Sequence, residues 1–226
     1  MEHQQLRRAA ATTDQTISAA SASPGPLHGE LSVGVIPTVT ALDVPSLLAR
    51  YRAAHPEVRV RLRTGSSAAL IADIAAGLVD AAILGLPETP PAGISARVLR
   101  RENLVAVVGS EHPLADHARL SLDELAPETF VDFPSGSAGR AQSDLAFAGT
   151  KLRREVAFEA LTVDMFLALV REGLAVALLP PAVVPDVPEL RAIPVAGAPV
   201  RTEYLAWRDA GPTPEALAFL ALVDES

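Results

Sequence analysis

Hydrophobic and polar residues follow two different periods along this chain, and the two periods succeed one another in a regular order. The segment ELSVGVI (30–36) alternates apolar and polar residues, as does VRVRLR (58–63), and such alternation predicts strands. The segment between them repeats apolar residues at the spacing of one helix face, at Val44, Leu47, Leu48 and Tyr51. A strand, a helix and a second strand in this order predict a parallel sheet with a right-handed crossover.

The same order continues through the first half of the chain. A second helix is predicted, with an apolar side formed by Leu70, Ile71, Ile74 and Leu78. A short buried strand follows at 80–85, and three prolines after it predict a surface loop. The segments ISARVLRR and NLVAVVGS then predict two consecutive strands.

The second half of the chain repeats this alternation of strands and helices. Strands are predicted at TFVDF, REVAFEA and LAVALLP, and helices at AGRAQSDLAFAG and TVDMFLALVREG. A long strand, VRTEYLAWRD (200–209), comes next, and a terminal helix with Thr213 as its N-cap ends the chain. The predicted fold class is α/β, with two Rossmann-like lobes built alike.

Two long strands, near 103–109 and 200–208, are the candidates for crossings between the lobes. The predicted domain boundaries follow from these crossings. Lobe I is expected to comprise residues 29–105 and 198–226, lobe II residues 106–197, and residues 1–28 a remnant linker helix or a flexible tail.

Composition narrows the classes of function. The chain has 226 residues, of which 49% are hydrophobic and none is cysteine, so a real core is possible while disulfides, thiolate zinc sites and cysteine nucleophiles are excluded. A net charge of −8 disfavours binding of nucleic acid by this chain alone, because such surfaces are normally basic. No apolar run approaches the roughly 20 residues that span a bilayer, and no signal peptide is apparent. We therefore expect a cytoplasmic location and no contact with a membrane.

Hydroxyl-bearing residues cluster at three predicted strand ends. The clusters contain Thr38 and Thr40, Ser66 and Ser67, and Ser135 and Ser137. Ligands of α/β sheets bind beyond the carboxyl ends of strands, and helix N-termini attract anions through free N–H groups and the helix dipole. For any one cluster, helix capping is the simpler explanation. Because the chemistry recurs at three strand ends, we interpret the clusters as one site for a small anion.

Three residues of the second half are further candidates for this site. Arg140 could pair with a carboxylate in bidentate fashion, or it could lie solvated on its helix. Thr162 begins a helix and is either an N-cap or part of the site. Phe133 either walls the pocket or packs in the core, and core packing is the simpler interpretation.

The sequence contains no pattern typical of catalysis. HExxH, GxSxG and the phosphate-binding P-loop are absent, and the five histidines are scattered without ligand spacing. The carboxylates lie mostly on predicted helix faces or turns, where solvation is the default. We therefore expect no catalytic residue, no metal site, no cofactor and no enzyme activity.

Several segments, in their order and spacing, resemble the effector-binding domain of the LysR-type transcriptional regulators. These segments are GELSVGVIPT, HPEVRVRLRTG, VVGSEHPLA, FVDFPSGSAGR and EGLAVALLP. Together they extend the resemblance from about Gly29 to the C-terminus. It implies a periplasmic-binding-protein type 2 fold and an effector pocket that includes Thr38, Ser66 and Ser137. His112, in the family's HPL segment, is interpreted as structural.

The resemblance also implies partners that the residues alone do not show. Regulators of this family carry an N-terminal winged helix-turn-helix that reads DNA, and a linker helix that helps them dimerise. Here residues 1–28 resemble the linker alone, either because the chain is a piece of a longer regulator or because it is a natural short form. We expect a small anionic effector such as a carboxylate, homo-oligomers (dimers, or tetramers in the full-length protein), and DNA contact only through the missing domain.

Three alternatives stay open at this point. A solute-binding protein of the same fold would deliver its ligand to a transporter. An enzyme acting in the cleft would turn the ligand over. A DNA-free antagonist would form mixed oligomers with complete regulators.

Overall fold

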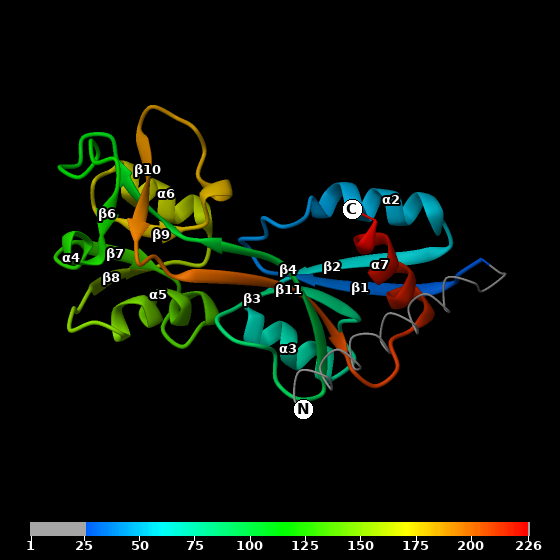
Figure 1. The fold of residues 1–226 in the computed structure, drawn as a ribbon. Coiled ribbons are helices and arrows are strands. Elements are labelled where there is room, and N and C mark those ends of the chain that lie inside the picture. The colour runs from blue at the N-terminus through cyan, green and yellow to red at the C-terminus, as the bar shows by residue number, and fades with distance from the viewer. Residues whose placement is uncertain (1–25, 226) are drawn as a thin grey trace.

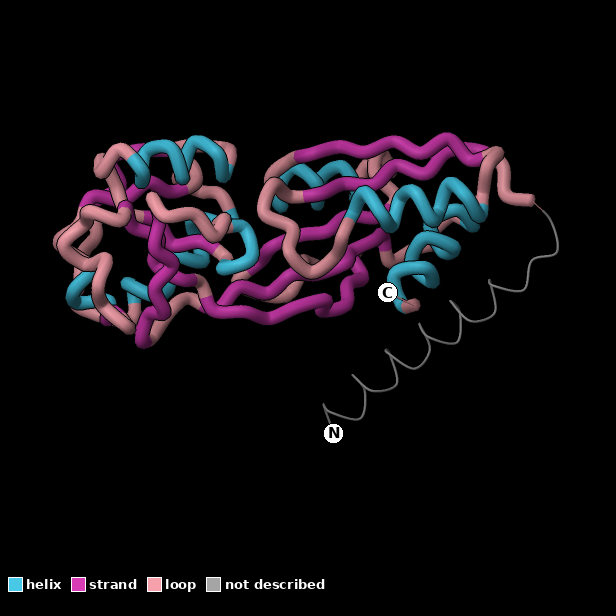
Figure 2. Tube along the Cα trace, turned by 90° about the horizontal axis from the view of Figure 1, so that it is seen from above, coloured by secondary structure: helices cyan, strands magenta, loops and turns pink. Residues whose placement is uncertain are grey.

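The structure, a computed structural model, describes residues 26–225 and consists of two parts that lie end to end (Figures 1 and 2). The first part is built on a five-stranded sheet with the order β2 (Val58–Thr64), β1 (Gly29–Val35), β3 (Ala81–Leu86), β11 (Val200–Arg208) and β4 (Ile94–Asn103). Of the predicted linker helix or tail (residues 1–28), residues 1–25 lie outside the described part of the chain.

The first sheet is mixed. Strand β1 pairs with β2 and with β3 in parallel, as the sequence pattern predicted. Strand β11, whose place in the sheet was not predicted, is antiparallel to both β3 and β4. The reason is that β11 returns from the second part and therefore enters the sheet from the opposite end (Figure 1).

Helices cover both faces of this sheet (Figure 1). One face packs against α2 (Val44–Ala54) and α7 (Pro214–Asp224), and the other packs against α3 (Ser67–Ala75). Tyr51 of α2 and Phe219 of α7 are fully buried on the first of these faces, with ring centroids 6.0 Å apart. Each of these three helices has a side-chain N-cap, and the caps are Asp43, Ser66 and Thr213. Thr213, the cap predicted for α7, accepts the N–H of Ala216.

Helix α3 is shorter than the sequence pattern predicted. Leu70 and Ile74 are buried as expected, but Leu78 is 59% exposed. The helix ends because Gly77 adopts a φ of 72°, and the N–H of Leu78 then turns back to the carbonyl of Asp73 at 2.8 Å. Val79 takes the buried position instead.

The second part contains a four-stranded sheet and a two-stranded pair. The sheet has the order β6 (Leu120–Ser121), β10 (Leu190–Ala196), β5 (Val105–Gly109) and β9 (Ala177–Leu179), and the parallel pair is β7 (Thr129–Asp132) with β8 (Glu155–Glu159). Its helices are α4 (Leu122–Leu125), α5 (Ala138–Ala148), α6 (Val163–Arg171) and the short 3-10 helix η1 (Pro181–Val183). Helices α4 and α5 contribute to one core and α6 to another, on the opposite side of β5.

Four of these elements, β6, α4, η1 and β10, were not predicted from sequence. Strand β10 contains Pro194 and follows a proline-rich segment, which hides its alternation. Strand β6 and helix α4 are too short to show a period. The start of α4 is nevertheless marked by a capping box, in which the side chains of Ser121 and Glu124 each accept the other's backbone N–H.

The chain crosses between the two parts at two places that are hydrogen-bonded to each other. It leaves the first part at Leu104 and returns at residues 197–199, and the N–H of Leu104 donates to the carbonyl of Pro199 at 3.0 Å. The second crossing therefore precedes the predicted segment, since β11 lies wholly in the first sheet. Just beyond β5, His112 accepts the N–H of Leu114 and lies 3.3 Å from Glu128, contacts that fit a structural role.

None of the helices within residues 26–225 combines the length and apolar character needed to cross a membrane.

Candidate ligand-binding site

A cavity of about 370 Å³ lies where the two parts meet. It is bordered by the end of β1, the first turn of α3, the end of β3, the turn after β7 and the first turns of α5. Its lining residues are Ile36, Pro37, Thr38, Ser66, Ser67, Ala68, Gly85, Phe133, Pro134, Ser135, Gly136, Ser137, Ala138, Gly139, Gln142, Leu161 and Arg201. Six of the nine sequence-predicted site residues are therefore brought together here: Thr38, Ser66, Ser67, Phe133, Ser135 and Ser137.

The N-terminus of α3 forms one side of the cavity. Ser66 is the N-cap, and its Oγ accepts the N–H of Ala69 at 3.2 Å. This bond leaves the N–H groups of Ser67 and Ala68, in the first turn, without a partner inside the helix. The Ser66 hydroxyl keeps its own proton for donation, so capping and ligand binding do not exclude each other at this residue.

Ser67 has a different role from the one the sequence suggested. Its side chain is buried, and its hydroxyl donates to the carbonyl of Gly85 at 3.0 Å and accepts the N–H of Gly85 at 3.1 Å. These two bonds join the start of α3 to the end of β3. The hydroxyl proton is already committed to Gly85, so Ser67 contributes its backbone N–H to the cavity rather than its side chain.

The N-terminus of α5 forms the facing side. Ser137 is its N-cap and accepts the N–H of Arg140 at 3.3 Å, while Gly136 before it has a φ of 81° that permits the tight turn. Phe133 packs against this turn, and a Cβ on Gly139 would come within 2.7 Å of its ring. Phe133 also contacts Phe166, with ring centroids 4.8 Å apart. Phe133 thus both walls the cavity and packs in the core.

Two predicted site residues of the second part lie outside the cavity lining. Arg140 binds Asp144 at 3.1 Å and Glu159 at 3.4 Å, which holds its guanidinium along the helix and away from the cavity. Thr162 caps α6 by accepting the N–H of Met165 at 3.4 Å. Thr162 therefore takes the simpler role considered from sequence, that of an N-cap. Arg140 is neither solvated nor part of the lining, because its side chain is only 18% exposed and is paired with two carboxylates of the protein.

Thr40 also lies outside the lining, in a buried polar network. Its hydroxyl is 2.6 Å from Oε1 of Glu102 and 2.5 Å from Oε1 of Glu203, and its N–H donates to Glu203 at 3.0 Å. These carboxylates occupy Thr40 fully, so it supports the site from behind rather than facing a ligand.

Arg201, which sequence analysis did not identify, is the centre of this network and lines the cavity. Its side chain is only 3% exposed, and its terminal nitrogens contact Glu102 at 3.3 Å, Glu203 at 3.0 Å and the carbonyl of Thr38. Burial lowers the pKa of Arg201 from its ordinary value, and the two carboxylates oppose that change. A signal was present in the sequence, because Arg201 and Glu203 stand two residues apart on one face of a strand predicted to be long.

Gln142 of α5 is the second lining residue that was not predicted. It is 4% exposed, and its Nε2 has no hydrogen-bond partner among residues 26–225. A glutamine inside a predicted helix carries no signal for such a position, since most helical glutamines are solvated.

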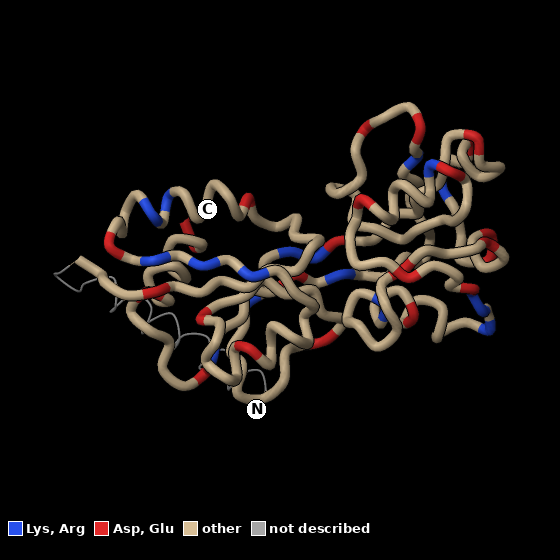
Figure 3. The backbone as a smooth tube through the Cα atoms, turned by 180° about the vertical axis from the view of Figure 1, so that it is seen from behind, with Lys and Arg blue, Asp and Glu red and all other residues tan. Residues whose placement is uncertain are grey.

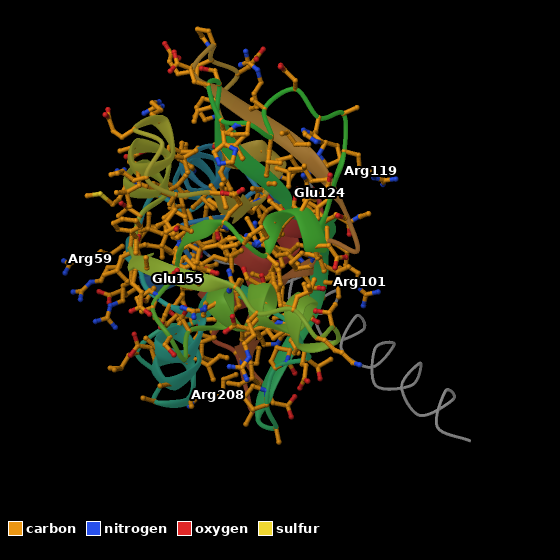
Figure 4. All side chains as sticks on the ribbon, turned by 90° about the vertical axis from the view of Figure 1, so that its left-hand side faces the viewer. Arg59, Arg101, Arg119, Glu124, Glu155 and Arg208 are labelled. Atoms are coloured by element: carbon orange, nitrogen blue, oxygen red, sulfur yellow. The ribbon has the colours of Figure 1, made fainter. Side chains whose placement is uncertain are left out.

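The cavity is weakly charged. Among its described lining residues, Arg201 alone is charged, and no aspartate, glutamate, lysine or histidine borders the space. Other arginines, such as Arg59, Arg101 and Arg119, point outward from the periphery (Figure 4). Within residues 26–225 no group of three or more histidine, cysteine or carboxylate side chains is arranged to hold a metal ion.

Comparison with known proteins gives this architecture a family. Residues 24–226 match the LysR substrate binding domain family. The chain belongs to the LysR substrate-binding domain family. The HTH-type transcriptional regulator IlvY of Escherichia coli (strain K12) is 29% identical to this LysR-family domain over 194 residues, covering 84% of this chain and 61% of the regulator. IlvY of Salmonella typhimurium is 31% identical with the same coverage, so the chain spans about three fifths of the length of these relatives.

Solved structures show the same fold at lower identity. The effector binding domain of QuiR in complex with shikimate superposes with a TM-score of 0.76 at 22% identity, covering 87% of this chain and 95% of that one. The BenM effector binding domain with its effector benzoate gives a TM-score of 0.73 at 20% identity, covering 88% and 92%. The LysR-family domain described here therefore has the periplasmic-binding-protein type 2 fold expected from the resemblance in sequence.

Proposed function

We propose that this chain is the effector-sensing regulatory domain of a LysR-type DNA-binding transcription factor, and that it binds a small anionic metabolite in the cavity between its two parts. The observation that carries the proposal is the pairing of two helix N-termini, those of α3 and α5, across one cavity. Each supplies free N–H groups, a positive dipole end and a serine hydroxyl to the same space. The relatives of the chain are transcriptional regulators, and two solved neighbours are named as complexes with small acids.

The two parts are the moving units in this proposal. We assign lobe I to residues 29–105 and 198–226 and lobe II to residues 106–197, with the chain passing between them at the two crossings. A ligand that contacts Ser66 in one lobe and Ser137 in the other binds more tightly when the lobes are close. It therefore shifts the population toward a closed or reoriented state by its difference in affinity for the two states. Couplings of about 1–3 kcal/mol are typical of such allosteric systems.

DNA contact and assembly are assigned to other surfaces. The chain covers about three fifths of the IlvY relatives, and its net charge is −8; both facts support our proposal that another part of the regulator binds DNA. Residues 1–28 would connect to that part. Strand β2 is an edge strand on which Leu62 is 50% exposed, and its arginines form a line in Figure 3. An open strand edge of this kind is suited to pairing in a homo-oligomer, dimeric or tetrameric. A regulator of this kind works in the cytoplasm.

The alternatives are less well supported. An enzyme acting in this cavity would need a nucleophile with a base, or an acid–base pair, and the described lining offers only hydroxyls, an amide and one paired arginine. A solute-binding protein would share the fold, but the relatives found by sequence are regulators.

A thermal melt of the whole chain against a panel of small carboxylic acids tests the proposal. A ligand present at about 100 times its Kd adds roughly 2.7 kcal/mol and raises the midpoint by about 2–4 °C for a chain of this size. The rise should be reduced in Ser66→Ala and in Ser137→Ala. Thr162→Ala is the matched control, because it also removes an N-cap, at a similar cost of about 0.5–2 kcal/mol, but lies outside the cavity lining.

The proposal fails if no acid in the panel raises the midpoint. It also fails if Thr162→Ala weakens the response as much as the two cavity variants do, because the loss would then follow from lost helix stability.

A further inference from the structure

One buried hydrogen-bond donor at the cavity has no hydrogen-bond partner within the described part of the chain. Nε2 of Gln142 finds no acceptor among residues 26–225, although the side chain is 4% exposed. Gln142 borders the main cavity and also an adjoining space of about 20 Å³. Buried polar groups are nearly always paired in native proteins, so an unpaired donor that borders a cavity points to a ligand that supplies the acceptor.

The floor of the cavity, formed by Gly85, Gln142 and Arg201, presents two nitrogen donors. A Cβ placed on Gly85 would lie 3.5 Å from Nε of Arg201 and 3.9 Å from Nε2 of Gln142, so both nitrogens approach the same point. The terminal nitrogens of Arg201 are already held by Glu102, Glu203 and the carbonyl of Thr38. The floor is therefore suited to an oxygen that accepts a hydrogen bond.

The sides of the cavity suit one negative charge and no positive charge. The first turns of α3 and α5 direct N–H groups and positive dipole ends inward. No carboxylate is present in the described lining. The nearby Glu159 is engaged by the N–H of Ser135 at 3.1 Å and by Arg140 at 3.4 Å. An ammonium group bound here would be buried without a counter-ion, which is costly.

The remaining walls are apolar. They are formed by Ile36, Pro37, Ala68, Phe133, Pro134, Ala138 and Leu161. A ligand of matching chemistry therefore has an apolar body between its charged end and its neutral polar group.

We propose that the effector is a singly charged, amine-free carboxylic acid with an apolar body and a second oxygen that accepts the Nε2–H of Gln142, and that Gln142 sets this specificity. The inference rests on the function proposed above, since it concerns the ligand of the same cavity. It separates carboxylic acids from the amino acids of the same carbon skeleton.

Calorimetric titration of the whole chain with matched probes tests the inference. The probes are 3-phenylpropionate, 3-(4-hydroxyphenyl)propionate and phenylalanine, with hexanoate, 6-hydroxyhexanoate and 2-aminohexanoate as the aliphatic series. The acids should bind, and the amino acids should bind at least about 100-fold more weakly than their amine-free counterparts. In at least one series an oxygen-bearing acid should bind about tenfold more tightly than the acid without that oxygen.

Two variants of Gln142 assign these preferences to its side chain. Gln142→Met keeps the length of the side chain and removes the donor, so the tenfold preference for the extra oxygen should disappear. The ligand-free melting temperature should stay equal or rise, because Nε2 makes no native bond. Gln142→Glu places a carboxylate in the cavity. The variant should bind the acids more weakly than the wild type does, and the difference in affinity between acids and amino acids should shrink or reverse. Leu145→Met, at an exposed position of the same helix, is the control.

The outcomes separate this inference from the proposed function. If the wild-type chain binds none of the acids, both fail. If acids bind but the amino acids bind within tenfold of them, or if Gln142→Met keeps the oxygen preference, the inference fails and the proposed function stands. If Gln142→Met lowers the ligand-free melting temperature and leaves the preferences unchanged, Nε2 serves the protein in the 20 Å³ space and the inference is overturned.

Discussion

The hydroxyl of Ser67 and the backbone of Gly85 form a closed pair of hydrogen bonds, with the hydroxyl donating to the carbonyl at 3.0 Å and accepting from the N–H at 3.1 Å. The pair holds the first turn of α3 against the end of β3. It also divides two neighbouring serines by function, because Ser66 keeps a free hydroxyl proton at the cavity while Ser67 does not.

Replacing Ser67 with alanine should therefore reduce stability rather than remove a ligand contact. The variant leaves the N–H and carbonyl of Gly85 without their buried partner, and such groups cost about 1–3 kcal/mol. Unfolding in urea should show a lower midpoint with an unchanged slope. An unchanged midpoint would mean that Gly85 finds other partners and that the Ser67 pair is not structural.

Gly85→Ala should lower the affinity for the ligand, with a moderate loss in the free energy of unfolding. The new methyl group would stand on the cavity floor, 3.5 Å from Nε of Arg201, and 2.9 Å from the terminal Cδ1 of Ile36, a side-chain end that can move. We expect a folding cost of about 1–3 kcal/mol and a clear fall in affinity by calorimetric titration. Gly149→Ala is the control, since a Cβ there meets nothing within 4 Å and the residue has an ordinary φ of −73°. Equal effects of the two variants on affinity would contradict the placement of the floor.

Arg201→Met should be strongly destabilising. Removal of the guanidinium leaves Glu203 buried without a cation and Glu102 with Arg100 alone, 3.9 Å away. Breaking a buried ion pair in this way typically costs about 3–5 kcal/mol. Adding Glu203→Gln to this variant should recover part of the loss, as measured by urea unfolding of both chains. Arg101→Met, at an exposed site, should change stability little. If Glu203→Gln lowers the free energy of unfolding of the Arg201→Met variant further, the unpaired carboxylate is not the source of the loss.

Asp80 should make the protein less stable as the pH rises through the acidic range. Burial raises the pKa of Asp80 above its ordinary value, and Glu215 and Glu30 add to the rise. The N–H of Ser32, which donates to Asp80 at 2.8 Å, and the charge of Arg208 act in the opposite direction. Because the folded state holds this proton more tightly than the unfolded state, the contribution of Asp80 to stability falls between the ordinary pKa and the raised one.

Asp80→Asn isolates this effect, because an amide oxygen can still accept the N–H of Ser32. The free energy of unfolding of the wild-type chain, minus that of the variant, should decrease as the pH rises from the ordinary aspartate pKa. A difference that is flat or increases with pH would contradict the raised pKa.

Much of the fold could be predicted from sequence because its signals are local. Alternation at 30–36 and 58–63 and the cap at Thr213 depend only on neighbouring residues, and the elements formed where these patterns indicated. The direction of β11 in the sheet could not be predicted in this way, since it depends on the route of the chain through the second part. The early end of α3, which exposes Leu78, depends on how Gly77 is used.

The candidate site divides along the same line. Ser66 and Ser137 were found because an N-cap has a local signature, and the fold then placed both at one cavity. Arg140 and Thr40 were attributed to the same cavity because sequence does not show which partner a polar side chain will choose. Gln142 was missed because its burial is decided by the packing of α5 against the first part.

A small acid that binds between the two parts should change their relative position. The chain has no cysteine, so spin labels can be introduced at Ala72→Cys on α3 and Ala148→Cys on α5, both exposed positions, with no background. The measurement is the distance distribution between the two labels by pulsed electron paramagnetic resonance, with and without the acid that raises the melting midpoint most. The acid should shift the distribution, and Ser137→Ala should reduce the shift at the same acid concentration. An unchanged distribution at a concentration of acid that saturates binding would contradict this prediction.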